Sequence, residues 1–258
     1  MEVVAQTLEV GRNLHILKVN AYDDKLIELI NKYLVKVCEG EDEDSADIQR
    51  VKKRLFKFIS TKHENTQMGA IAEFFIHLYL NDCNYKQEFL FFNLEETSIK
   101  KGFDGLYTKE DEIYVIESKS GKEDTEDISH LGKIKEAYND LKKYFNGTSD
   151  KGNNNPWRNA YNHASHNDIK AKDSLKKQIK TLANLYDEEI YGDIKDYNIV
   201  PCSTIFLDSE WKEGYIDDFL DSVDKLNFLI AKNSDVIILT KLKLSNFMDF
   251  LGLENNND

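Results

Sequence analysis

Two carboxylates and a lysine on one predicted hairpin have residue types and a spacing that could support chemistry. Thr108–Asp111 is predicted to form the turn, which places Val115 opposite Asp104. Glu117 lies two residues further along the same strand. Because side chains alternate across a strand, Glu117 shares a face with Asp104 at a diagonal distance of about 7–8 Å. Lys119 faces the same way, so we expect the three side chains to converge.

The three side chains suit a site for one divalent cation. Two carboxylates, waters and a phosphate oxygen make an ordinary Mg²⁺ site, and Mn²⁺ takes the same ligands. Asp104 and Glu117 would bind the cation, and Lys119 would hold a water and balance charge at phosphorus. Lys119 is expected to stay cationic beside Glu117, which favours water positioning over a general-base role.

Glu117 and Lys119 could instead form a structural ion pair, because Glu-x-Lys pairs on strands are common and contribute little to stability when exposed. Residues 113–116 are apolar on both faces of the predicted strand, however, which is typical of an internal strand. Charges at the end of such a strand are costly unless they are paired or bind a metal. This pattern favours the cation site.

Glu73 is a further candidate, because it is the only acid in the apolar helix predicted over residues 68–80. A helix that is apolar nearly all round is a buried one. Glu73 would add a metal ligand, directly or through water; alternatively, it lies on an exposed edge or pairs with a lysine. His77 follows one turn later, and a hydrogen-bonded core histidine is favoured there over a metal ligand.

The elements that must position these residues follow from hydrophobic periodicity and turn signals. A strand hairpin is predicted in residues 1–20, with further strands at 88–93, 102–107, 112–119, 198–207 and 236–240. Helices are predicted at 26–37, at 45–59 with Ser45 as cap, from Thr66 as cap to residue 80, and at 128–145, 173–186, 216–231 and 245–251. This order predicts an α/β fold with a mixed central sheet and helices on both of its faces.

Residues 146–168 form a polar stretch rich in Asn and Gly, which predicts a long loop or insertion. Its two histidines, His163 and His166, are expected to be surface residues and not metal ligands. The acidic run 39–47 is interpreted mainly as a solvated loop, with a docking or DNA-mimicking surface as the alternative. The basic stretches 50–62 and 170–180 are either solvated helix faces or phosphate-binding tracks.

Composition limits the class of protein. The 258 residues suit one large domain or a core with an added subdomain, and 47 acidic against 34 basic residues leave a net charge of −13. No run approaches the roughly 18 apolar residues of a membrane span, and the first residues do not resemble a signal peptide. The three cysteines lie far apart and are interpreted as reduced thiols in a cytoplasmic protein. The chain has neither a P-loop nor an HExxH motif.

The arrangement resembles the PD-(D/E)xK nuclease superfamily, whose core is an αβββαβ sandwich. The matching residues are Glu73, Asp104, Glu117 and Lys119. Phe103 replaces the nominal proline of the superfamily, which is often absent. Ser118, between Glu117 and Lys119, is counted with Asp104, Glu117 and Glu73 as a candidate metal ligand. The resemblance implies a nuclease core over residues 66–210, an N-terminal extension (1–65) and a C-terminal addition (211–258).

A closer resemblance is to the HamA family, the nuclease subunits of Hachiman anti-phage defence. It rests on GAIAEFFIHLYL, KKGFDGLY, IYVIESKSG and KIKEAYNDLKKYF, within residues 66–145. The resemblance implies a metal-dependent DNA endonuclease that acts as a defence effector with a helicase partner, HamB. One alternative is a stand-alone restriction endonuclease that uses loop 146–168, including Arg158, to read bases. Another is a non-catalytic interaction module on a nuclease-like fold.

Overall fold

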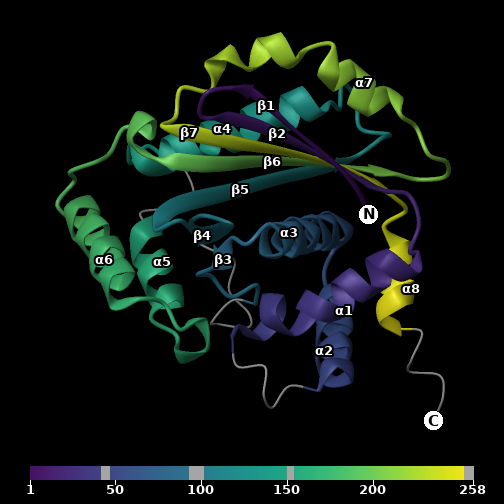
Figure 1. Cartoon of the computed structure of the whole chain (residues 1–258), viewed down its shortest axis with the longest axis horizontal. Helices are drawn as coiled ribbons and strands as arrows, with labels where there is room; N and C mark the ends of the chain where they lie inside the picture. Colours follow the sequence, from purple (N-terminus) through teal and green to yellow (C-terminus); the bar gives the residue numbers. More distant parts are fainter. Residues whose placement is uncertain (42–46, 93–101, 150–153, 253–258) are drawn as a thin grey trace.

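One twisted sheet runs through the molecule in the computed structural model, which describes residues 1–41, 47–92, 102–149 and 154–252 (Figure 1). Its seven strands lie in the order β1-β2-β7-β6-β5-β4-β3. Their bounds are β1 Glu2–Glu9, β2 Arg12–Val19, β3 Lys86–Gln87, β4 Gly105–Lys109, β5 Glu112–Lys122, β6 Asn198–Leu207 and β7 Asn233–Leu242. Strands β2, β7, β6 and β5 are parallel, whereas β1 and β4 pair antiparallel with their neighbours. The sheet is therefore mixed, as the sequence predicts.

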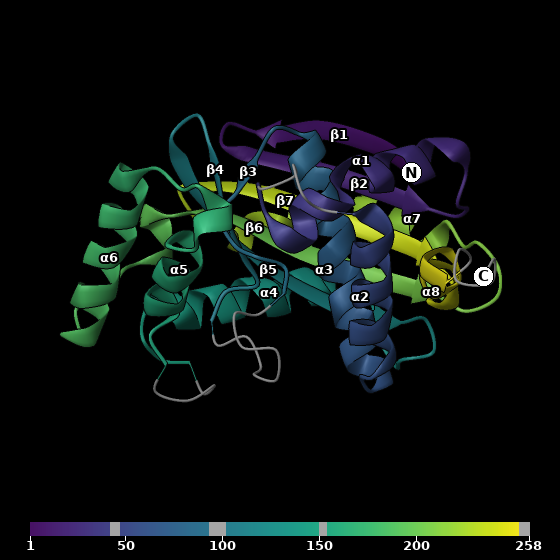
Figure 2. The same ribbon diagram turned by 90° about the horizontal axis from the view of Figure 1, so that it is seen from below.

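Helices cover both faces of this sheet, which confirms the predicted α/β class (Figure 1). Helices α1, α2, α3 and α8 pack on one face, while α4 and α7 pack on the other. Helices α5 and α6 pack together beside the β4 and β3 edge (Figure 2). The bounds are α1 Asp24–Glu39, α2 Ile48–Ser60, α3 Glu64–Asp82, α4 His130–Phe145, α5 Pro156–Ala164, α6 Asp173–Asp187, α7 Gly214–Leu220 and α8 Ser245–Gly252.

The predicted N-terminal caps of two helices need correction. Asp47 caps α2, because its side chain accepts a hydrogen bond from the backbone N–H of Gln49. The predicted cap, Ser45, lies outside the described residues. Helix α3 begins at Glu64, so that Thr66 is inside its first turn and the prediction of a Thr66 cap was wrong.

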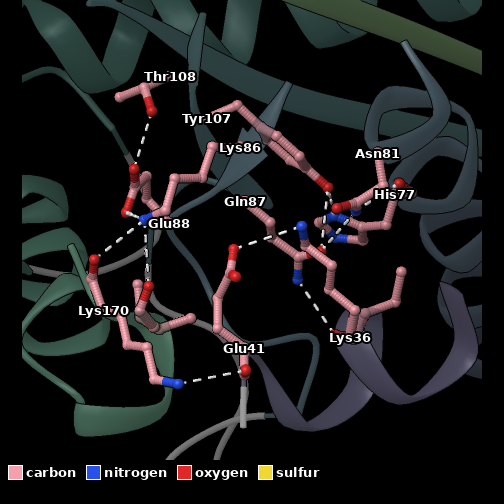
Figure 3. Close-up of polar contacts among 12 residues, drawn as sticks. Lys36, Glu41, His77, Asn81, Lys86, Gln87, Glu88, Tyr107, Thr108 and Lys170 are labelled. Atoms are coloured by element: carbon pink, nitrogen blue, oxygen red, sulfur yellow. Dashed lines mark hydrogen bonds and ion pairs between the residues drawn. The ribbon is translucent and has the colours of Figure 1, made fainter. Parts of the chain in front are cut away.

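The predicted strand over residues 88–93 is also wrong within its described part, because β3 consists only of Lys86 and Gln87. A polar network holds this segment instead (Figure 3). The Gln87 amide donates to the carbonyls of Val37 and Phe89. Glu88 accepts hydrogen bonds from Lys86 and Thr108. The apolar residues 89–92 thus pack as irregular chain, and the polar residues Gln87 and Glu88 before them tie the segment to α1 and β4.

The polar stretch 146–168 contains a helix that sequence reasoning missed. Asn155 caps α5, accepting from the Arg158 N–H, and Pro156 occupies the first turn, where a missing N–H costs nothing. His163 is only 1% exposed. Its ring stacks on Phe89 at 4.3 Å, and its Nδ1 accepts from the backbone N–H of Leu90. The expectation of a surface histidine at 163 was therefore wrong.

The long helix predicted over residues 216–231 is divided into α7 and a 3₁₀ helix, Val223–Phe228. The N-terminal hairpin is present as predicted and belongs to the same sheet, because β2 pairs in parallel with β7 along residues 12–19. The boundaries at residues 65 and 210 remain a prediction.

Candidate functional site

The hairpin of β4 and β5 turns one residue later than predicted. Lys109 pairs with Glu112, so Glu110 and Asp111 form a two-residue loop, with φ of 52° and 63°. Two positive φ angles define the type I′ turn, which usually carries Asn or Gly. The pairing is thereby shifted by two residues along β5. An even shift keeps every side chain on its predicted face.

Asp104 lies beside the part of β5 that carries Glu117. Gly105 pairs with Ile116, and the Asp104 N–H donates to the Ile116 carbonyl at 3.1 Å. The paired ladder ends at Gly105, so Asp104 lies just outside β4 and is held beside β5 by its own backbone and side chain. The Ser118 N–H donates to Asp104 Oδ2 at 2.8 Å and fixes the carboxylate.

Lys119 occupies the predicted face and contacts two carboxylates. Its Nζ lies 2.7 Å from Glu117 Oε1 and 2.7 Å from Asp140 Oδ2, which comes from α4. Burial on its own would lower the pKa of Lys119, but Glu117, Asp140 and Asp104 together raise it above its ordinary value. Lys119 is therefore cationic at neutral pH, as predicted, and is unsuited to act as a base.

The same carboxylates affect two further buried groups. Burial, followed by Glu117 and Asp104, raises the pKa of Tyr144. Burial and the same two acids raise the pKa of Cys202, so this thiol stays protonated. The causes of these shifts place Asp104, Glu117, Lys119 and Tyr144 in one neighbourhood, between β4, β5 and α4.

Sequence reasoning missed Asp140 and Tyr144. They are four residues apart on α4, so they lie on the same side of that helix. The spacing was visible in the sequence, but nothing in it indicated that this side of α4 meets Lys119.

Ser118 and Glu73, the other two predicted metal ligands, are not placed on the face of β5 that carries Glu117 and Lys119. Because side chains alternate, the Ser118 side chain points to the face opposite Glu117, so that any ligand role would fall to its carbonyl oxygen. Glu73 is half-buried on α3, which packs against that opposite face. The contacts described above run through β4, β5 and α4, and a place for Glu73 in the site stays a prediction.

His77 is a core histidine, as the sequence favours. It is 2% exposed, and its Nδ1 lies 2.5 Å from the Tyr107 hydroxyl (Figure 3).

The donor set fits a hard divalent cation with few protein ligands. Asp104 and Glu117 supply carboxylate oxygens, the ligands that Mg²⁺ and Mn²⁺ prefer. Among the described residues, no three or more His, Cys, Asp or Glu side chains are grouped to hold a metal ion. Mg²⁺ is usually bound by one or two carboxylates with waters and substrate phosphates, and Asp104 and Glu117 are the residues that could supply those carboxylates.

The fold and the site define an α/β protein with paired carboxylates and a lysine on an internal hairpin. Comparison with protein families matches the HamA family model over residues 2–251, and the chain belongs to that family. This places it among the proteins of Hachiman antiviral defence. Searches of curated proteins and of solved structures gave no match. In the described part of the chain, no helix has both the length and the apolar character needed to cross a membrane.

Proposed function

We propose that the protein is a metal-dependent DNA endonuclease of the PD-(D/E)xK type, the effector subunit of a defence complex with a helicase partner. The observation that carries this proposal is that the Asp104 carboxylate accepts a hydrogen bond from the Ser118 N–H, next to Glu117, while the Lys119 ammonium lies 2.7 Å from Glu117. Family membership supports the defence role and the expectation of a partner.

Each residue has a distinct role in the proposed reaction. Asp104, held by the Ser118 N–H, and Glu117 would bind Mg²⁺ or Mn²⁺. The bound cation would supply Lewis acidity at the phosphate and lower the pKa of a water. Lys119, cationic and fixed by two carboxylates, would orient the attacking water and offset the charge that develops at phosphorus.

The test is cleavage of plasmid DNA by the purified chain in Mg²⁺ or Mn²⁺, beside Glu117→Ala and an EDTA control. Cleavage by the wild type that is lost in both controls supports the nuclease. If the wild type is inactive alone, the assay is repeated on the complex that co-purifies from the native host. Inactivity of that complex too would favour a non-catalytic interaction module. Full activity without a bound helicase would favour a stand-alone restriction endonuclease.

A further inference from the structure

The ammonium of Lys119 is shared between two carboxylates that come from different elements. Glu117 lies on β5 with a side chain 1% exposed, and Asp140 lies on α4 with a side chain 24% exposed. Both oxygens are 2.7 Å from Nζ, which is within the range of charge-assisted hydrogen bonds. Lys119 therefore has a second anchor outside the proposed pair of metal ligands.

This second anchor matters once Glu117 takes on the role proposed above. Its carboxylate would then serve a divalent cation and the Lys119 ammonium together, and like charges a few ångströms apart repel. Lys119 can relieve this repulsion by giving up its bond to Glu117, but only if another anion holds it near the site. Asp140 is already in contact with it and belongs to a helix that packs on β5.

We propose that Asp140 is a positioning residue that retains Lys119 in the site when Glu117 binds the divalent cation. The inference rests on the proposed function, because it assumes that Glu117 is a metal ligand. Without the Asp140 carboxylate, the Lys119 ammonium would remain on Glu117 and compete with the cation. Loss of Asp140 should therefore weaken metal binding through Lys119, and not only by removing one negative charge.

Titration calorimetry of the full-length chain with Mn²⁺ tests this coupling in a double-mutant cycle. The four proteins are the wild type, Asp140→Asn, Lys119→Met and the double variant. We expect Asp140→Asn to raise the Kd for Mn²⁺ about tenfold, which corresponds to about 1.4 kcal/mol. In the Lys119→Met background the same change should alter the Kd less than about twofold, because no ammonium is left to compete.

Glu136→Gln is the matched control, since Glu136 is also on α4 but pairs with Lys133. It should leave Mn²⁺ binding nearly unchanged. If Asp140→Asn weakens Mn²⁺ binding equally in the wild type and in the Lys119→Met background, the effect is a long-range charge effect and the inference is overturned. So would an unchanged Kd in Asp140→Asn. If Asp140→Asn does not fold by circular dichroism, Asp140→Ser replaces it in the cycle. A wild type that does not bind Mn²⁺ would overturn the proposed function itself, and the inference with it.

Discussion

Loss of Lys119 should reduce cleavage without reducing metal binding, whereas loss of Asp104 or Glu117 should reduce both. Lys119→Met removes the ammonium 2.7 Å from Glu117 and keeps the length of the side chain. Cleavage should fall by about 100-fold or more, because the residue proposed to orient the water and offset charge at phosphorus is gone. Mn²⁺ binding should persist or tighten, since a positive charge has left the ligand shell.

Plasmid cleavage and calorimetry on the same preparation separate these two effects. Lys122→Met is the comparison, because Lys122 is on the same strand but pairs with Glu64. Near-normal cleavage by Lys119→Met would contradict the role assigned to Lys119.

His130 should make the fold sensitive to acid. It is 1% exposed, and its ring nitrogens lie 2.8 Å from Ser203 Oγ and 3.0 Å from Thr240 Oγ1. Burial lowers the pKa of His130 from 6.5 to about 3. Between these two values the unfolded chain binds the proton and the folded chain does not, so stability is complete above pH 6.5 and falls as the pH decreases toward 3.

From pH 6.5 to pH 5.0 this loss is about 2 kcal/mol. The free energy of unfolding should be measured in urea at both pH values. Between pH 6.5 and pH 5.0 it should decrease less in His130→Gln than in the wild type, by the amount assigned to His130, whatever the overall stability of the variant. His166→Gln, which alters a histidine that is not buried, should behave like the wild type. An identical decrease in wild type and His130→Gln would contradict the assignment to His130.

At the scale of elements, the β4–β5 turn combines a demanding conformation with residues that disfavour it. Glu110 and Asp111 both have positive φ, which costs a non-glycine residue about 1–2 kcal/mol each. Changing Glu110 to Asn and Asp111 to Gly together should stabilise the protein by about 1 kcal/mol, because Asn-Gly suits a type I′ turn. The exposed pair of Asp111 with Lys172 is lost, which offsets little of this gain.

Thermal unfolding of the double variant and of Asp111→Ala measures the effect. The alanine variant loses the same ion pair but keeps a side chain that disfavours positive φ, so its Tm should not rise. A Tm that is equal for both variants would show that the turn conformation is not the limiting feature.

This turn also shows how far the site could be predicted from its sequence. Because side chains alternate along a strand, Glu117 and Lys119 share one face of β5 whatever the register. Asp104 was placed on that face by the predicted register, and the observed shift of two residues, an even number, leaves this inference unchanged. The register depended on the turn, and Glu-Asp carries no signal for a two-residue loop. Asp140 joins the site through the packing of α4 on β5, a tertiary contact that helical periodicity cannot supply.

Helices and strands could be predicted where their apolar residues follow a regular pattern, and they were missed or misassigned where that pattern is absent or misleading. The apolar stripes of α1 and α4 and the apolar runs of β6 and β7 predicted these elements, because the same residues are buried in the structure. Helix α5 was missed because its polar composition masked the Asn155 cap and Pro156, although both are recognised helix-start signals. Residues 89–92 have strand composition and are buried, but they pack as irregular chain and form no strand.

For the whole molecule, the order of strands predicts that the proposed nuclease core over residues 66–210 does not fold alone. Strand β7 lies between β6 and β2, in the interior of the sheet, and its Ile237, Ile238 and Leu239 are fully buried. Strand β2 in turn covers the other edge of β7, with Leu14 and Leu17 fully buried. Burial of each such side chain contributes about 1.5–3 kcal/mol, so loss of either strand would remove much of a stability of about 5–15 kcal/mol.

A chain that lacks residues 1–20 should therefore be unfolded or aggregated, and one that ends at residue 210 likewise, as judged by circular dichroism and gel filtration. The comparison is a chain that lacks residues 253–258 only, which should fold like the wild type because β7 and α8 remain complete. Folding of the 66–210 segment by itself would contradict this argument and show that the hairpin β1–β2 and β7 are additions to an independent core. If only the chain that lacks residues 253–258 folds, then Asp104, Glu117 and Lys119 are held in position by a sheet to which both residues 1–20 and residues after 210 contribute.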